Sequence, residues 1–365
     1  MADGFTKSAA PLPGDDPLLQ HNALWDDLPC AWGGAVGSGR IRTAPEDFRV
    51  VEVASVVPAG AGEHSWLYVR KRGSNTQWVA RELARHAQVP LSAVSYAGLK
   101  DRNAVTEQWF SVHLPGRPDP DWETLDSDAF QVLRAVRHSR KLKTGTLRGN
   151  RFVVRIRRFD APREHFERRL QQLAAGGFPN YFGHQRFGHD GSNLAAAAQL
   201  LFGRRGRVSR HQRGIYISAV RAALFNRLLA ARVADGSWNT ALPGAALQLQ
   251  GKSACFVAEE VDTVLLERLR ALEVHPTGPL CGAGDVLACG HAAHYEQDVL
   301  QSCGHWIAAL QRLRVSAARR ALRVVPGDLG CAPDEQGNPV LEFFLPAGAY
   351  ATSLLREILG PDPVA

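Results

Sequence analysis

The chain has 365 residues, of which 45% are hydrophobic and 22% are charged, which is the usual composition of a soluble globular protein with a sizeable core. The net charge is +7, the acids and prolines at the N-terminus are unlike a signal peptide, and no uncharged stretch has membrane-spanning length. We therefore expect a cytoplasmic protein of two domains, with no membrane partner and with its six cysteines reduced.

The first half of the chain is predicted to be rich in strands. Residues 1–38 contain many Pro, Gly and Asp residues and are expected to form a loosely ordered leader. A helix is predicted to begin at a cap on Asn75 or Thr76 and to stop at Pro90, because apolar residues recur there at helical spacing. Strands are predicted at 48–57, 65–71, 93–98, 107–114, 130–138 and 151–159.

The second half changes character at about Gly177. Helices are predicted to dominate from there to Val324, including a long helix at 294–322, before a strand at 339–348 and a short helix at 351–359. This order indicates that a helix-rich domain is inserted into a sheet-bearing one. The predicted segments are the leader at 1–38, the sheet-bearing domain at 39–176 and 325–365, and the inserted domain at 177–324.

Positive charge is concentrated in two stretches. There is no Asp or Glu from Ala129 to Phe159, and a block at 204–213 contains five Arg. The first stretch holds ten cations, namely Arg134, Arg137, Arg140, Lys141, Lys143, Arg148, Arg151, Arg155, Arg157 and Arg158. Because like charges this dense repel one another, RNA phosphates are a natural partner, and a solvated basic face is the alternative. One face of the strand at 151–159 is apolar and the other is mainly basic, which suits a sheet that presents cations to a ligand.

Cysteine and histidine gather near 281–305, but their spacing is not typical of zinc. The group consists of Cys281, Cys289, His291, His294, Cys303 and His305. It contains no C-x2-C pair, so we interpret it as scattered buried thiols and expect no metal. The phosphate-loop motif G-x-x-x-x-G-K-[ST] and the G-x-S-x-G elbow are absent, which argues against a nucleotide-driven enzyme and against a serine hydrolase.

An aromatic and glycine-rich stretch, GFPNYFGHQRFGHDGSN at 177–193, lies at the predicted entry to the inserted domain. Its rings, Tyr181, Phe182 and Phe187, are candidates for base stacking beside Arg186. A structural hinge whose aromatic residues are buried is the alternative, and both interpretations stay open.

The stretch YAGLKDRNAVTEQWF at 96–110 places Asp101 between Lys100 and Arg102, at a turn before a strand. Adjacent cations favour the ionised form of a carboxylate, which is then available as a nucleophile or a base. We interpret Lys100 and Arg102 as the cations that keep Asp101 ionised. A solvated turn whose charges bind nothing is the alternative.

Five stretches resemble the TruD family of tRNA pseudouridine synthases. They are APEDFRVVE at 44–52, YAGLKDRNAVTEQWFSVHLPG at 96–116, LRGNRFVV at 147–154, PNYFGHQRFG at 179–188 and LPAGAYATSLLREIL at 345–359, and they occur in the family's order. The resemblance covers nearly the whole chain beyond the leader. It implies an α+β fold, in which a pseudouridine synthase catalytic domain has a mixed, largely antiparallel sheet flanked by helices and carries an inserted, helix-rich α/β TRUD domain.

The same resemblance assigns the site residues. Asp101 matches the essential aspartate of the family's G-x-K-D motif. The residues expected at the uridine pocket are Phe48, Asn150, Phe152, Tyr350 and Arg42. Tyr350 stands where a Phe is usual, so its hydroxyl needs a partner, and Arg42 stands where a Lys is common.

The implied reaction is the isomerisation of a uridine in tRNA, at uridine 13 of the D-arm. The N-glycosidic bond breaks, the uracil reorients, and C5 joins the ribose C1′. Asp101 would attack C1′ or C6 as a nucleophile or remove a ribose proton as a base, and these roles stay open. No metal, nucleotide or other cofactor is implied, and a monomer is expected. The alternative is a catalytically silent tRNA-binding protein that keeps the fold and acts as a folding chaperone.

Overall fold

A computed structural model describes residues 16–19, 25–203 and 208–361. The fold is of the α+β class, as the sequence predicts, and its contacts divide the chain into two compact units. The sheet unit consists of 36–174 and 326–351. The helix-rich unit consists of the described parts of 1–35, 175–325 and 352–362.

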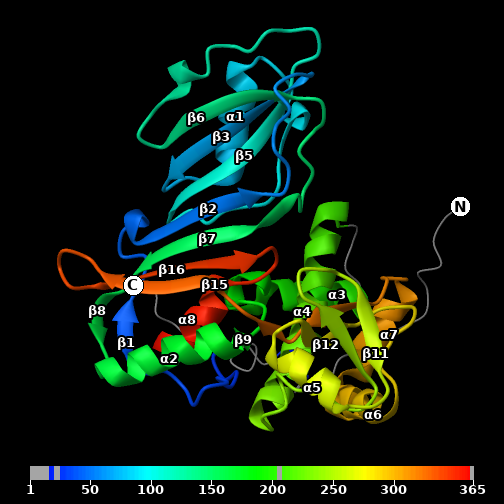
Figure 1. Ribbon diagram of the computed structural model, residues 1–365. Helices are drawn as coiled ribbons and strands as arrows, with labels where there is room; N and C mark the ends of the chain where they lie inside the picture. The colour runs from blue at the N-terminus through cyan, green and yellow to red at the C-terminus, as the bar shows by residue number, and fades with distance from the viewer. Residues whose placement is uncertain (1–15, 20–24, 204–207, 362–365) are drawn as a thin grey trace, which may run out of the picture. The chain divides into compact units, whose positions relative to one another are not determined.

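The sheet unit is built on one eight-stranded sheet, in the order β15-β16-β7-β2-β5-β3-β6, with β4 paired to β5 (Figure 1). Every pairing within it is antiparallel except that of β2 with β5, so the sheet is mixed and largely antiparallel. Its strands are β2 (Phe48–Ala54), β3 (His64–Arg72), β4 (Val94–Tyr96), β5 (Val105–His113), β6 (Phe130–His138), β7 (Leu147–Arg155), β15 (Gly327–Pro333) and β16 (Pro339–Pro346). The unit also contains the paired strands β1 (Ser38–Arg40) and β8 (Arg157–Asp160) and the helices α1 (Thr76–His86) and α2 (Arg163–Gly176).

Helix α1 lies against β3 and β5 and forms a hydrophobic core with them (Figure 1). Val79 and Leu83 recur on one side of the helix and are fully buried against strand residues such as Val69 and Phe110. The helix begins where the sequence predicts, but the side chain of Asn75 makes no cap hydrogen bond. This amphipathic packing, rather than capping, therefore fixes the position of α1.

Strand register places several polar and aromatic side chains on one face of the sheet. Val50 of β2 is the Cα partner of both Phe152 in β7 and Thr106 in β5, and Thr106 is the partner of Lys71 in β3. Because paired residues share a face and alternate residues on a strand do too, one set of side chains points the same way. This face, the site face, carries Phe48, Glu52, Lys71, Asn150 and Phe152.

The predicted strand at 151–159 is two strands in the structure. β7 starts earlier, at Leu147, and ends at Arg155, and β8 follows from Arg157. After Arg155 the chain leaves the large sheet, and β8 pairs antiparallel with β1 instead. Within β8, Arg158 adopts a left-handed φ of 51°, and the register of the pairing with β1 is irregular.

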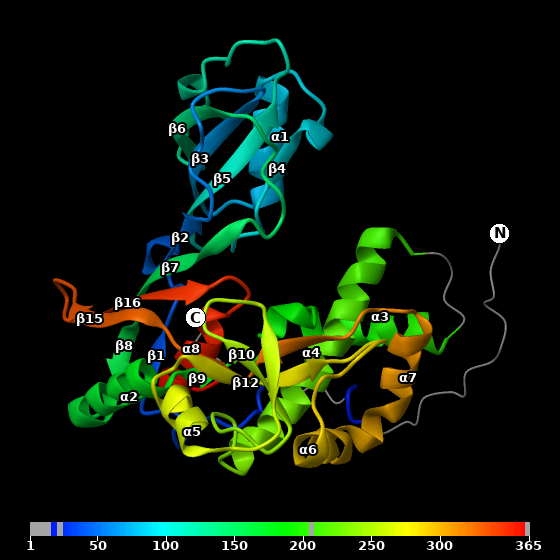
Figure 2. The same cartoon turned by 45° about the vertical axis from the view of Figure 1, so that its right-hand side comes forward.

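The helix-rich unit packs helices around a four-stranded sheet in the order β11-β10-β12-β13 (Figure 2). Gly278 of β12 lets α4 approach closely, since a Cβ there would lie 2.9 Å from Leu228. The strands are β9 (Phe178–Pro179), β10 (Ala245–Leu249), β11 (Cys255–Ala258), β12 (Val274–Leu280), β13 (Ala318–Ala321) and β14 (Arg323–Val324). The helices are α3 (Ser192–Leu201), α4 (Arg210–Ala234), α5 (Thr263–Arg270), α6 (Gly290–Leu300), α7 (Gly304–Arg312) and α8 (Ala351–Leu359).

The prediction of one long helix at 294–322 is wrong. Helix α6 ends at Leu300, α7 ends at Arg312, and the remaining part of the segment contains the strand β13. Arg314 has a left-handed φ of 52°, and β13 pairs with β12. Tertiary pairing thus overrides the helix propensity of an Ala- and Arg-rich sequence.

The described part of the predicted leader is packed rather than loose. Leu18, Trp25 and Leu28 are buried, and the indole Nε1 of Trp25 donates to the carbonyl of Pro361 at 2.9 Å. Helix α8, which was predicted to belong to the sheet-bearing domain, lies almost wholly in the helix-rich unit. The unit boundaries within the described chain fall at 35/36, 174/175, 325/326 and 351/352. Among the described helices, none has both the length and the apolar character needed to cross a membrane.

Candidate active site

Asp101 lies in the loop between β4 and β5, beside the start of β2. Because β2 and β5 are parallel neighbours, with Arg49 opposite Val105, the residues that precede these two strands meet at one edge of the sheet. Arg42 reaches this edge from the segment before β2, and its Nη2 contacts Asp101 Oδ2 at 2.7 Å. The guanidinium also lies over the ring of Phe48, 4.1 Å from the centroid. The structure thus brings together three of the predicted site residues.

The segment that carries Arg42 is held in an uncommon backbone conformation. Arg42 has a φ of 61°, in the left-handed region that residues with a side chain rarely adopt. Downstream, the fully buried carboxylate of Asp47 accepts hydrogen bonds from the backbone N–H of Ala44 at 2.9 Å and from Arg157 Nε at 2.7 Å. Burial alone would raise the pKa of Asp47, but these hydrogen bonds and one from Arg155 lower it below its ordinary value. An anionic Asp47 therefore fixes the turn that presents Arg42.

Neither sequence neighbour of Asp101 plays the part that the sequence predicts. Lys100 turns inward, and its Nζ pairs with Glu52 Oε2 at 2.7 Å in an almost fully buried ion pair. Arg102 is exposed, and its Nε donates to the carbonyl of Gly73 at 3.4 Å. The interpretation of these two cations as partners of Asp101 is wrong, because the turn directs one of them into the core and the other toward Gly73.

Polar side chains from β3, β5 and α1 hold the loop around Asp101. Gln108 Nε2 donates to the carbonyl of Gly98 at 3.1 Å, and the backbone N–H of Lys100 donates to Thr76 Oγ1 at 3.0 Å. The Nζ of Lys71 donates to the carbonyl of Asp101 at 2.7 Å. Thr76 was one of two residues predicted as the helix cap, and its hydroxyl binds this loop instead.

Sequence reasoning missed Lys71 and Glu52. Each is a charged residue in a row of alternate strand residues that are otherwise apolar and buried. Lys71 follows Leu67 and Val69 in β3. Glu52 follows Phe48 and Val50 in β2. A charge in an apolar row is the signal that could have found both residues.

Aromatic rings form the layer beside Arg42. Phe48 is 1% exposed and meets Phe152 edge-on, with ring centroids 6.0 Å apart. Phe152 stacks on Phe343 of β16 at 5.3 Å. Phe152 therefore packs beside Phe48, and it points from the same face of β7 as Asn150. Because Phe48 is almost wholly covered, a flat ligand reaches its ring only if neighbouring groups, Arg42 among them, move.

Asn150 offers an unused acceptor on the site face. It is half-buried in β7, opposite Glu52 of β2 and Leu345 of β16. Its Oδ1 is buried and has no hydrogen-bond partner within the described structure. A buried acceptor without a donor costs about 1–3 kcal/mol, so a ligand N–H at this point would be favourable.

Tyr350 lies in the turn that follows β16 and is half-buried. The last residue of that strand, Pro346, is opposite Gly149, and the N–H of Ala347 donates to the carbonyl of Arg148 at 3.1 Å. The turn therefore starts beside the strand position that precedes Asn150.

The basic stretch from 134 to 158 is divided between paired and exposed cations. Arg155 and Arg157 converge on Asp47, at 3.2 and 2.7 Å, so the basic strand face binds an internal acid rather than standing open to a ligand. Arg137 and Arg151 also pair with carboxylates. Arg151 is exposed as well as paired, and the six remaining members of the stretch are all exposed: Arg134, Arg140, Lys141, Lys143, Arg148 and Arg158. Of the second basic block, residues 204–207 lie outside the described residues, and Arg210 and Arg213 are exposed at the start of α4.

The other candidate sites from the sequence are structural. Tyr181, Phe182 and Phe187 are buried, which favours the hinge interpretation of 177–193 over base stacking. Within the described residues, no three His, Cys, Asp or Glu side chains are arranged to hold a metal. His305 Nε2 instead meets Asp16 Oδ2 at 2.7 Å, and burial raises the pKa of the Cys281 thiol to about 11.

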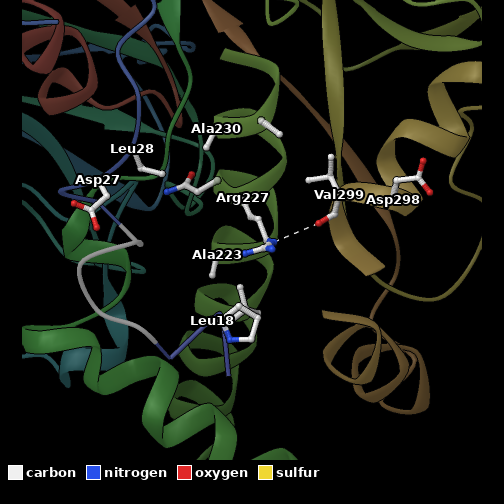
Figure 3. A pocket seen from close by; sticks show the side chains of 11 residues that line it. Leu18, Asp27, Leu28, Ala223, Arg227, Ala230, Asp298 and Val299 are labelled. Carbon is white, nitrogen blue, oxygen red and sulfur yellow. Dashed lines mark hydrogen bonds between the residues drawn. The ribbon is translucent and has the colours of Figure 1, made fainter. Parts of the chain in front are cut away.

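A cavity of about 450 Å³ in the helix-rich unit does not belong to the candidate site. Figure 3 shows Arg227 at its wall, donating to the carbonyl of Val299 at 3.3 Å. The acids Asp27 and Asp298 also line it, and none of the predicted site residues does. A cavity with two carboxylates in its wall is poorly suited to an RNA phosphate.

The chain matches the sequence profile of the family described as tRNA pseudouridine synthase D (TruD) over residues 33–205 and 204–358. A curated tRNA pseudouridine synthase D from Methylococcus capsulatus is 47% identical over 339 residues, which cover 93% of this chain and 96% of that protein. One from Nitrosococcus oceani is 45% identical, covering 90% and 93%.

A solved structure supports the fold. The crystal structure of a TruD protein from Methanosarcina mazei aligns with a TM-score of 0.70 at 22% identity, covering 96% of this chain and 99% of that one. The profile match and the relatives cover nearly the whole chain. The chain therefore belongs to the TruD family of tRNA pseudouridine synthases, which are isomerases.

Proposed function

We propose that the chain converts uridine to pseudouridine in tRNA with Asp101 as the essential carboxylate. The observation that carries this assignment is the ion pair of Asp101 with Arg42 at 2.7 Å, which orients a partly exposed carboxylate at the edge of the site face. Family membership supports the reaction. The resemblance of GLKD at 98–101 to the family's G-x-K-D motif supports the choice of this aspartate.

The site face offers groups that suit an extruded uracil. A target base must leave its stack, and this costs a few kcal/mol that contacts in the pocket recover. The unpartnered Oδ1 of Asn150 can accept the N3–H of uracil, which cytosine lacks. Phe48 and Phe152 supply apolar packing for the base, after Arg42 shifts from the Phe48 ring. Tyr350, in the turn after β16, is a further residue proposed to line the uracil pocket.

The chemistry conserves atoms and oxidation state. The N1–C1′ bond breaks, the uracil turns, and C5 bonds to C1′, after which the C5 proton leaves to solvent and N1 gains a proton. Asp101 assists as a nucleophile at C1′ or C6 or as a base on the ribose. Since nothing is oxidised or phosphorylated, the reaction requires neither a redox nor a nucleotide cofactor.

The finer parts of the proposal rest on resemblance to the family. They are that uridine 13 of the D-arm is the target, that the enzyme works as a monomer without a metal, and that it acts in the cytoplasm. Replacing uridine 13 by cytidine in an otherwise unchanged tRNA should abolish turnover, and turnover at another uridine in that tRNA would contradict this target.

Tritium release from tRNA labelled at uridine C5 tests the catalytic role. Wild-type protein should release the label because C5 exchanges its hydrogen for the bond to C1′. In Asp101→Asn the rate of tritium release should fall by at least about 1,000-fold. Its affinity for tRNA should change little, because the variant keeps the shape of the site. Asp160→Asn, which alters an exposed acid at the end of β8, is the matched control and should turn over normally.

The outcomes separate the enzyme from a silent binder. Wild-type protein that binds tRNA and releases no label would favour the folding-chaperone alternative. Unchanged turnover by Asp101→Asn would remove Asp101 from its role.

A further inference from the structure

We propose that Lys71 is a positioning residue for the reaction, because it holds the Asp101 peptide in the orientation that directs the carboxylate toward Arg42 and the substrate. The inference rests on the proposed function, since its main readout is uridine isomerisation. It concerns a residue that does not touch the uridine and acts through the backbone of one that does.

The geometry of Lys71 supports this role. It lies near the end of β3 on the site face and is fully buried. Its side chain does not extend to solvent, as lysine side chains usually do. Its Nζ instead donates to the carbonyl oxygen of Asp101 at 2.7 Å. A buried side chain near the end of β3 thus donates to the peptide that carries the reactive carboxylate.

A lysine is a poor choice here if stability is the purpose. Burial lowers the pKa of Lys71 from 10.5 to about 8, while the charge of Asp101 acts to raise it and that of Lys100 to lower it. The ammonium is therefore costly to bury, and an unbranched apolar side chain of similar length would fill the same space without that cost. Function at the site, rather than core packing, explains the amine.

Lys71 also occupies a distinct place among the contacts that hold the loop. Gln108 and Thr76 bind the backbone of Gly98 and Lys100, upstream of the carboxylate. Arg42 binds the carboxylate itself. Lys71 holds the carbonyl between these two groups of contacts, so its loss removes a contact that orients the Asp101 peptide, while Gln108 and Thr76 still anchor the preceding part of the loop.

The test is Lys71→Met, which keeps the length and burial of the side chain and removes the donor. We expect a folded protein whose melting temperature is at or above that of wild type, with unchanged KM and Kd for tRNA. We expect kcat for tritium release to fall about 100-fold, because a small misplacement of a reacting group has an effect of this size. A residue that only supports the fold would lower stability and activity together.

A second variant, Lys71→Gln, keeps an N–H donor but no ammonium. Its kcat should lie between those of wild type and Lys71→Met. A kcat at or below that of Lys71→Met would contradict the importance of donation. Because Gln is polar and shorter, this variant also remains informative if Lys71→Met does not fold.

Thr106→Val is the matched control. Thr106 is the cross-strand partner of Lys71, it is buried on the same face, and its Oγ1 has no partner within the described structure. This change removes a buried polar atom beside Lys71 without altering any contact of the loop, so kcat should stay at the wild-type value.

Hydrogen exchange gives a readout that is independent of turnover. The segment 98–104 should exchange faster in Lys71→Met than in wild type, and Thr106→Val should not change it. Wild-type kcat in a folded Lys71→Met, or a raised KM at constant kcat, would overturn the inference. Absence of tritium release by the wild type would instead defeat the proposed function itself.

Discussion

Burial of the Lys71 amine makes the stability of the protein depend on alkaline pH. The folded protein loses this proton near pH 8 and the unfolded chain near pH 10.5, so between these values the unfolded state binds more protons. The free energy of unfolding of wild type, relative to Lys71→Met, should therefore rise as pH increases from 8 to 10. Urea denaturation of both proteins at several pH values measures this, and a constant or falling difference would contradict the burial of a charged amine.

Residues around Asp101 show how far the sequence could predict the site. The motif predicts Asp101 as the essential carboxylate, and strand alternation explains why Phe152 and Asn150 share a face. Which cation meets Asp101 was not predictable, because Arg42 lies 59 positions earlier in the chain and arrives through the pairing of β2 with β5. Adjacency in sequence favoured Lys100, whereas the turn directs Lys100 to Glu52.

At the scale of elements, the Glu52–Lys100 ion pair joins β2 to the loop before β5. Both side chains are almost fully buried, and Glu52 Oε1 also accepts from the backbone N–H of Trp109 at 3.3 Å. Removing one partner leaves a buried charge unpaired, so Lys100→Met should lower the free energy of unfolding by about 3–5 kcal/mol.

The double variant Glu52→Met with Lys100→Met removes both charges and should recover most of that loss. Urea denaturation of the two single variants and the double variant gives the coupling energy. Additive losses would mean that the pair is not coupled in the folded protein.

Elements with a strong period were predictable from the sequence, and those fixed by distant partners were not. Strand β6 and helix α8 fall at the predicted bounds, and α1 has a clear apolar side. The strands β10, β11 and β12 lie in the block that was expected to be helical. They are short, and they are stabilised by one another and by helices that pack on them, which no local pattern records.

At the scale of the whole molecule, the exposed cations between 134 and 148 predict that tRNA affinity falls as the salt concentration rises. Arg140 and Lys143 lie in the connection from β6 to β7. This connection contacts the loop that carries Asp101, because the N–H of Gly145 donates to the carbonyl of Ala97 at 2.7 Å. If these cations contact phosphates, log Kd for tRNA should rise steeply with log salt. Arg140→Gln or Lys143→Gln should each reduce that slope by about 1.

Arg163→Gln is the control for this series, because Arg163 is an exposed cation on α2, outside the basic stretch. Fluorescence anisotropy across a salt series measures the slopes. A flat profile for wild type, or an equal change in slope for Arg163→Gln, would argue that these cations form a solvated face.

The chain passes between its two units at 35/36, 174/175, 325/326 and 351/352. This arrangement determines which of the two units is fully synthesised first during translation. All strands of the large sheet have been synthesised once β16 ends at Pro346. The helix-rich unit still lacks α8, whose Glu357 accepts from the backbone N–H groups of Ala31 and Trp32 at 3.0 and 3.2 Å. A nascent chain can therefore assemble the loop that carries Asp101 before the helix-rich unit has all its parts, and the segment around Ala31 and Trp32 must wait for α8, one of the last segments described, to leave the ribosome.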